Sequence, residues 1–271
     1  DYVMWLDADD CVPVKTINSV LNWKNDSAEN ADFYYLKYRM GYNSDFWFWR
    51  ERIIKRCKKC RFKGFIHEAV VPFGFTKRFD GEVIHTSSQN HASRNLNVYR
   101  KAIENKKKFS PRDKYYYART LIENGMHNEA LPVLRKFCYC KNAFSVDKAE
   151  AYKLIAKYYL SKLNVNIALK YLSKSVSVLL PDAETRCLLG DCFYVNNDCA
   201  SAAEWYEFAL TSKVQRGFVN DYFKAFYPLV QLSVCYFRMG ETDKAKTFHL
   251  AAKSISPDNP AVLSNDKWFV T

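Results

Sequence analysis

Small residues recur in pairs along the second half of the chain, and this pattern strongly limits how that half can fold. The first members of the pairs are Ala118, Ala156, Gly190 and Ser233, and the second members, each twelve positions later, are Ala130, Ala168, Ala202 and Ala245. Turn-forming residues stand between the two members. Because small side chains let antiparallel helices approach closely, we expect stacked helical hairpins in this half.

The spacing of these pairs is similar to that of a known repeat. First members follow one another at intervals of 38, 34 and 43 residues, close to the 34 residues of the tetratricopeptide repeat. Residues typical of that repeat occur at Tyr159, Phe193 and Tyr236, with Pro181 and Pro257 at unit ends. Residues 112–271 therefore resemble an all-α tetratricopeptide solenoid of about four units, with an insertion around residues 215–222.

Residues 1–90 have a mixed pattern that predicts an α/β fold. Apolar residues at near-helical spacing predict a helix over Val14–Lys24. Short β-rich runs, separated by turn residues, predict strands. These runs are 33–38, 46–49, 53–54, 69–71 and 83–84. Residues 91–111 form a linker in this prediction, with a helix over 95–109, and the turn beginning at Ser110 is expected to cap the next helix.

The chain opens on an apolar run, Tyr2–Leu6, that is followed by Asp7, Asp9 and Asp10. The run predicts a buried strand with acids at its carboxyl end, where open α/β sheets place their ligands. Clustered carboxylates are stabilised by a hard cation such as Mg²⁺ or Mn²⁺. The alternative is that the acids cap the helix that starts near Pro13. The run by itself leaves both interpretations open.

Three later places in this half carry candidate functional residues. Arg52 lies in a short basic strand, which could also be a plain exposed edge. Gly64 permits a close backbone approach to a ligand, and Glu68, next to His67, could act as a general base. His85 follows an apolar pair and could bind a metal or simply form hydrogen bonds at a strand end.

Taken in order, these motifs resemble the C-terminal part of the catalytic domain of a family 2 glycosyltransferase with a GT-A fold. The resemblance covers residues 1–90 and rests on Asp-x-Asp, a strand with an arginine, Gly-x-Ile-His-Glu, and an apolar pair before a histidine. One branch of the family, which includes S-glycosyltransferases of bacteriocin cysteines, often carries tetratricopeptide repeats after this domain. The fold class implied is a partial GT-A sheet followed by the helical solenoid.

The resemblance also implies roles for single residues. Asp7, Asp9 and His85 would hold Mg²⁺ or Mn²⁺. Asp7, Asp9 and Arg52 would bind the donor. Gly64 and His67 would lie on the acceptor side, and Glu68 would be the catalytic base. The implied reaction is inverting, metal-dependent transfer of a hexose from a nucleotide sugar, a UDP-sugar by this resemblance, to a protein, peptide or glycan acceptor.

The strands that precede Asp-x-Asp in such enzymes bind most of the nucleotide, and they have no counterpart before Asp1. The chain also lacks an initiator methionine. We therefore expect a fragment that by itself neither binds the donor tightly nor turns it over. The rival hypothesis is a non-catalytic tetratricopeptide interaction module. In either case the repeats are expected to bind a protein or peptide or to form a homodimer.

Composition limits the location and the partners. The net charge is +12 and the basic residues are densest in Lys55–Lys63, but no nucleic-acid-binding signature accompanies them, so we expect no nucleic-acid partner. No apolar stretch is long enough to span a bilayer. Nine cysteines, most in apolar helical contexts, indicate reduced buried thiols and a cytoplasmic protein. The Cys57-x-x-Cys60 spacing could suit zinc, but it has no second pair of matching spacing nearby.

Overall fold

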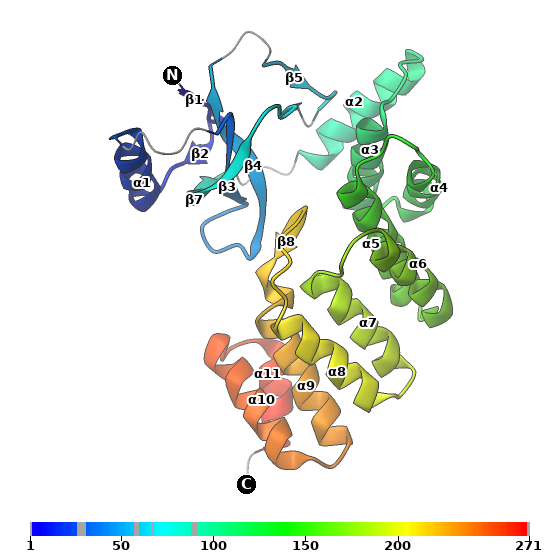
Figure 1. Cartoon of the computed structure of the whole chain (residues 1–271). Helices are drawn as coiled ribbons and strands as arrows, with labels where there is room; N and C mark the ends of the chain where they lie inside the picture. Colours follow the sequence, from blue (N-terminus) through cyan, green and yellow to red (C-terminus); the bar gives the residue numbers. More distant parts are fainter. Residues whose placement is uncertain (1, 26–30, 57–59, 67, 88–90, 270–271) are drawn as a thin grey trace. The chain divides into compact units, whose positions relative to one another are not determined.

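The computed structural model describes residues 2–25, 31–56, 60–66, 68–87 and 91–269. The chain divides by its internal contacts into two compact units (Figure 1). The first unit contains residues 1–133 and 216–219, and the second contains residues 134–215 and 220–271. Each unit has its own hydrophobic core. The limits predicted for the catalytic part, the linker and the repeats stay predictions.

A six-stranded sheet forms the centre of the first unit. Its strands are β1 (Tyr2–Met4), β2 (Asp10–Cys11), β3 (Phe33–Arg39), β4 (Phe46–Lys55), β7 (Thr76–His85) and β8 (Phe218–Asn220). The order is β1-β4-β3-β7-β2, and β8 also pairs with β4. Strand β3 is parallel to β7, whereas the β1–β4, β3–β4 and β2–β7 pairs are antiparallel. The β2–β7 register places Asp10 opposite His85.

Strand β4 is longer than its sequence predicts. The pattern suggested separate strands over 46–49 and 53–54, because the charged residues Arg50, Glu51 and Arg52 interrupt the apolar run. The structure has one continuous strand. Burial of charge requires partners, and both buried residues have them. Glu51 accepts a hydrogen bond from the backbone N–H of Val70 (3.0 Å), and Arg52 forms ion pairs described below.

The helix expected after the acid run is present as α1 (Val14–Asn25). It packs against the sheet through contacts with β7, and Val20 and Trp23 lie on the core that contains Tyr34 and Phe79. Thr16 Oγ1 accepts a hydrogen bond from the backbone N–H of Glu82 (2.9 Å) on β7. The apolar face and this hydrogen bond together hold the chain that follows the acid run.

Helices follow the sheet in the first unit and make up most of the second unit. They are α2 (Ala92–Glu104), α3 (Pro111–Glu123), α4 (His127–Cys138), α5 (Ser145–Ser161), α6 (Val165–Val178), α7 (Ala183–Val195), α8 (Cys199–Leu210), α9 (Phe226–Arg238), α10 (Thr242–Ile255) and α11 (Pro260–Asp266). The predicted cap of α3 is confirmed. Ser110 and Asp113 form a capping box, with the backbone N–H of Asp113 donating to the Ser110 hydroxyl (3.2 Å).

The second unit is a stack of helix pairs, α5–α6, α7–α8 and α9–α10. The small residues that predicted these pairs are buried between them. Gly190 shows why size matters, because a Cβ atom there would lie 2.7 Å from the ring of Tyr206. Tyr206 is itself fully buried and donates a hydrogen bond to Asp191 (2.7 Å). The expected repeat of paired helices is thus confirmed.

The insertion expected around residues 215–222 contains structure that the sequence pattern did not indicate. It forms β8 and the 3₁₀ turn η1 (Asp221–Phe223). Phe218 stacks on Phe46 with ring centroids 5.5 Å apart, and the guanidinium of Arg119 lies 3.7 Å from the Phe218 ring centroid. A segment from between two repeats therefore extends the sheet of the first unit.

A buried lysine links the first two helix pairs of the second unit. Lys153 on α5 is 2% exposed, and its Nζ lies 2.7 Å from Glu150, 2.8 Å from Glu184 and 3.1 Å from Asp182. Asp182 also caps α7 by accepting from the backbone N–H of Thr185 (2.7 Å). Because a buried ammonium must be paired, these contacts fix α5 against the start of α7.

The cysteines and the helices give two further findings. The eight cysteines of the described residues are free, and Cys138, Cys187, Cys192 and Cys235 are buried. Cys57 lies outside the described residues. Among the helices described, none combines the length and the apolar character needed to cross a bilayer.

The carboxyl excess around Lys153 predicts a dependence of stability on pH. Burial raises the pKa of Glu150 to about 7, against an opposing effect of Lys153. The folded state then binds more protons than the unfolded chain between about pH 4.5 and about pH 7. The stability from this group is therefore full below the unfolded pKa and is lost as pH rises through that window.

Glu150→Gln should remove the loss of stability between about pH 5 and about pH 7.5, which we expect to be on the order of 2 kcal/mol in the wild type. The measurement is the free energy of urea unfolding at about pH 5 and about pH 7.5. The exposed Glu204 on α8 offers a matched control, and Glu204→Gln should keep the wild-type difference between the two pH values. An unchanged difference in Glu150→Gln would contradict the prediction.

Candidate functional site

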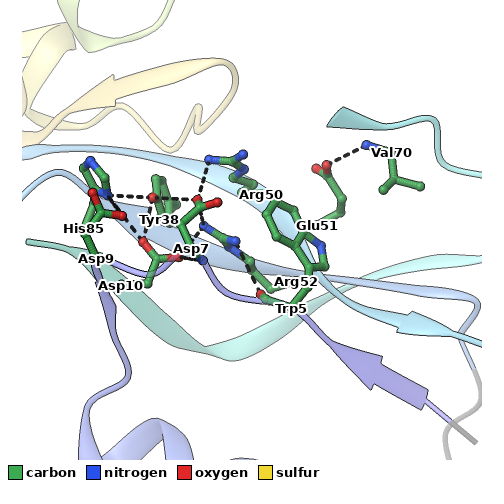
Figure 2. Close-up of polar contacts among 10 residues, drawn as sticks. All are labelled: Trp5, Asp7, Asp9, Asp10, Tyr38, Arg50, Glu51, Arg52, Val70 and His85. Atoms are coloured by element: carbon green, nitrogen blue, oxygen red, sulfur yellow. Dashed lines mark hydrogen bonds and ion pairs between the residues drawn. The ribbon is translucent and has the colours of Figure 1, made fainter. Parts of the chain in front are cut away.

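A tight turn at the end of β1 gathers the three acids of the opening run (Figure 2). The backbone N–H of Asp10 donates to the carbonyl of Asp7 (3.0 Å), and the N–H of Asp7 donates to Asp10 Oδ2 (2.9 Å). Thr86 then holds Asp9 from the end of β7, donating to the Asp9 carbonyl from its N–H (2.8 Å) and its hydroxyl (2.7 Å). The turn is closed by its own polar groups, so the acids have a defined orientation.

Asp10 forms a fully buried ion pair with Arg52. Both side chains are 0% exposed, and Arg52 Nη2 lies 2.8 Å from Asp10 Oδ2. The Tyr38 hydroxyl donates to the other oxygen, Asp10 Oδ1 (2.7 Å). Burial, and then the hydrogen bond to Asp10, raises the pKa of Tyr38 well above its usual range, so Tyr38 stays protonated and keeps this donor. β2, β3 and β4 are joined at this point.

Asp9, Asp10 and His85 form a group that could hold a metal ion. One ligand atom from each lies within 4.8 Å of the other two. His85 Nδ1 is 3.4 Å from Asp9 Oδ1, 3.4 Å from Asp10 Oδ1 and 3.0 Å from the Tyr38 hydroxyl. The structure therefore brings together Asp9 and His85, as predicted for the metal site, and adds Asp10.

The donor set of this group suits a divalent cation. Carboxylate oxygens are preferred by Mg²⁺ and Mn²⁺, and the imidazole nitrogen favours a transition metal such as Mn²⁺. Asp10 Oδ2 is used by Arg52 and by the Asp7 N–H, whereas Oδ1 accepts from the Tyr38 hydroxyl and lies 3.4 Å from His85 Nδ1, on the side of the other ligand atoms. Asp9 is 43% exposed, which gives a cation access. These residues fit the metal that the sequence predicts.

Asp7 contacts the arginines of β4 and the Tyr38 hydroxyl (3.4 Å), and it is not one of the three residues whose ligand atoms converge. Its Oδ2 lies 3.3 Å from Arg52 Nη2 and 3.6 Å from Arg50 Nη1, and its side chain is 42% exposed. Arg50 is 22% exposed, whereas Arg52 has no exposed surface. The donor contacts predicted for Asp7, Asp9 and Arg52, and the metal contact predicted for Asp7, stay predictions.

Gly64, one of the two predicted acceptor-side residues, lies in a hairpin. Its strands β5 (Phe62–Lys63) and β6 (Ala69–Val70) are antiparallel, and Gly64 follows β5 with φ of 132°, a value that favours glycine. Glu68 is exposed just before β6. The described polar contacts of the acid cluster do not include Glu68, so its role as a base stays a prediction. His67 lies outside the described residues.

The partners of Asp10 lie outside α1. That helix begins at Val14, and the Ile17 N–H donates to the carbonyl of Pro13 (3.0 Å) at its start. The carboxylate of Asp10 is instead used by Arg52, Tyr38 and the Asp7 N–H. Between the two interpretations of the opening run, the geometry favours a polar site over a helix cap.

Three cations of the basic stretch, Lys55, Arg56 and Arg61, line an apolar cavity in the first unit. The cavity has a volume of about 190 Å³ and is lined by apolar side chains from β1, β4, β5 and β6 and by three cations. Its lining comprises Val3, Trp5, Ile54, Lys55, Arg56, Cys60, Arg61, Phe62 and Val70. Part of the net positive charge thus borders an apolar surface within the sheet unit.

Sequence reasoning missed the residues that support the acids. Asp10 was seen only as the third acid of a run, and Tyr38 and Trp5 only as strand residues. The rings of Trp5 and Tyr38 lie on the Arg52 guanidinium, with centroids 4.0 Å and 4.4 Å from its carbon. An arginine within an otherwise apolar strand was the available signal, because such a charge needs a buried partner.

Comparison with known proteins identifies the fold of the helical part. No family model matches the chain, and no curated protein matches it in sequence. Among solved structures, pilF of Pseudomonas aeruginosa superposes with a TM-score of 0.53 at 15% identity, covering 66% of this chain and 77% of that chain. The Cut9–Hcn1 hetero-tetramer of the APC/C gives a TM-score of 0.50 at 17% identity, covering 63% of this chain.

This chain covers only 31% of the length of the Cut9–Hcn1 chain that it matches. YrrB, described as a TPR protein with an unusual peptide-binding site, gives a TM-score of 0.49 at 18% identity, covering 66% of this chain and 84% of that chain. At these identities the likeness shows the fold alone. The matches to pilF and to Cut9–Hcn1, together with the stacked helix pairs, show that the helical part is a tetratricopeptide-like array, as predicted, while the GT-A assignment of the sheet stays a prediction.

Removal of one partner from the buried ion pair should destabilise the first unit. Asp10→Asn would leave the Arg52 guanidinium buried without its closest carboxylate, and we expect a loss of about 3–5 kcal/mol in unfolding free energy. Asp9→Asn, at an exposed side chain in the same turn, should cost less than about 1 kcal/mol. Urea unfolding followed by tryptophan fluorescence measures both. Equal losses of unfolding free energy in the two variants would show that the buried Asp10–Arg52 ion pair does not stabilise the first unit more than the exposed Asp9 does.

Proposed function

We propose that the helical array binds a protein or peptide partner, which is the function that the fold of this chain supports best. The observation that carries the proposal is the stack of helix pairs, which is similar in fold to pilF and to Cut9–Hcn1. Cut9–Hcn1 is itself an assembly of protein chains. Helical-repeat arrays present extended surfaces to their partners.

The first helices of the pairs offer the surface. Within the second unit α5 contacts α7 and α7 contacts α9, so these helices form a continuous layer. The layer carries mixed polar and aromatic groups. Lys157 on α5 is 44% exposed, lies 2.7 Å from Glu184, and has its ammonium 5.9 Å from the ring centroid of Phe223. Arg238 on α9 lies 4.6 Å from the ring centroid of Tyr194 on α7. Such a surface suits a peptide with both charged and apolar side chains.

The test starts from peptides selected against the whole chain from a random display library. Lys157→Glu should weaken their binding by at least about tenfold, because it reverses a charge on the proposed surface. Lys170→Glu places the same change on the exposed side of α6, a second helix, and should leave affinity within about twofold. Isothermal titration measures both. Equal effects of the two variants, or a failure to select any peptide, would argue against this surface.

A second candidate function is metal-dependent glycosyl transfer, and the acid cluster is the specific observation that favours it. The cluster combines ligand atoms for a divalent cation with two arginines, of which Arg50, beside Asp7, is 22% exposed. A cation there would stabilise negative charge on a departing nucleoside diphosphate. Asp9 and His85 would hold the cation, and Arg50 would face the diphosphate. In this proposal the helical array binds the protein or peptide acceptor in the cytoplasm.

Asp9→Ala in the full-length protein should abolish Mn²⁺-dependent hydrolysis or transfer of a nucleotide sugar. We expect a fall of at least about 100-fold, because the variant removes the most accessible carboxylate of the group. Asp80→Ala, at an exposed acid on β7, is the matched control and should retain activity. The readout is release of nucleoside diphosphate across a panel of donor sugars. Unchanged release in Asp9→Ala would rule out this role for the cluster.

A further inference from the structure

We propose that Arg52 is a positioning residue of the acid cluster, which sets the carboxylate of Asp10 so that Asp9, Asp10 and His85 can hold one divalent cation. The proposal rests on the metal site of the second proposed function. It differs from the donor contact expected from the sequence, because a side chain with no exposed surface offers nothing to a donor. Its role is exerted through other residues.

The Arg52 guanidinium is held in a fixed plane. Its carbon lies 4.0 Å from the ring centroid of Trp5 and 4.4 Å from that of Tyr38, within the range of cation–π contacts. Arg50, its neighbour on the same face of β4, also lies near these rings, at 4.9 Å and 5.0 Å. A planar group packed against two aromatic rings cannot rotate freely, so its N–H groups point in set directions.

Those N–H groups contact three acceptors around the turn. Nη2 lies 2.8 Å from Asp10 Oδ2 and 3.3 Å from Asp7 Oδ2, and Nη1 donates to the backbone carbonyl of Trp5 (3.3 Å). Arg52 thereby connects the end of β1 with both flanking acids of the turn. A lysine ammonium could replace the charge but not this spread of donors.

The main geometric argument is that the two carboxylate oxygens of Asp10 have different partners. Oδ2 is taken by Arg52 and by the Asp7 N–H. Oδ1 faces His85, 3.4 Å from its Nδ1, and accepts from the Tyr38 hydroxyl (2.7 Å). Arg52 therefore fixes the carboxylate by one oxygen and leaves the other on the side where the three ligand atoms converge. Partners that orient metal ligands in this way commonly tune affinity.

Charge alone predicts the opposite effect from positioning. A cation close to a metal site repels the metal, so a purely electrostatic role would make Mn²⁺ bind more tightly when Arg52 is neutralised and equally well when it becomes lysine. A positioning role predicts weaker binding when the charge is kept but the planar contacts are lost. Arg52→Lys separates the two.

The experiment measures Mn²⁺ affinity of the whole chain from the electron paramagnetic resonance signal of free Mn²⁺, with thermal melts to confirm folding. Arg52→Lys should bind Mn²⁺ about 10-fold more weakly than wild type. Arg78→Lys is the matched control, since the Arg78 guanidinium also lies on an aromatic ring, Trp49, at 4.8 Å, and Arg78 stands on β7 opposite Tyr35 of β3, whereas His85 of the same strand pairs with Asp10. It should bind within about twofold of wild type.

Trp5→Leu provides a second variant if Arg52→Lys does not fold. It removes one ring from the guanidinium while keeping the arginine, and it should also weaken Mn²⁺ binding by several-fold. Unchanged or tighter binding in a folded Arg52→Lys variant would overturn the positioning role and leave the metal site standing. A wild-type chain that binds no Mn²⁺ would overturn the metal site and, with it, this inference.

Discussion

A guanidinium without any exposed surface is the constraint on which the first unit is organised. A charge of this kind is costly to remove from water, so every group around it must compensate. Arg52 obtains a carboxylate from Asp10, a second from Asp7 and the faces of two aromatic rings. In the turn after β1, Asp7 and Asp10 are oriented by this charge, while Asp9 is held by Thr86. Two acids of the candidate site thus also pair with the buried Arg52.

The second unit also contains a buried cation that is paired with carboxylates, in this case a lysine. Lys153 is surrounded by carboxylates from α5 and from the start of α7, and two of the three belong to the neighbouring helix pair. Elsewhere in the array, small apolar residues let the helices pack closely. A buried charge is more selective than an apolar contact, because displacement of its partners leaves it unpaired. This cluster therefore specifies that α7, of the next helix pair, packs beside α5.

Periodic features were predictable from sequence, and features that depend on distant partners were not. Helix α1, the pairs built on Ala156 and Gly190, and the Ser110 cap follow from local patterns. The strand β4 was divided in two because its charged residues contradict an apolar pattern. Their burial depends on groups far along the chain, which no local window contains. In the same way Asp9 and His85 were predicted together, while the support from Asp10, Tyr38 and Trp5 was not.

Strand β8 has a consequence for the order in which the chain assembles. The helix pairs form from contacts between neighbouring segments and need only short loops. Pairing of β8 with β4, by contrast, joins residues separated by most of the chain, and such closure carries a larger entropy cost and a slower rate. During synthesis, the part of β4 that pairs with β8 therefore lacks this partner until α5–α8, the first two helix pairs of the second unit, have been made.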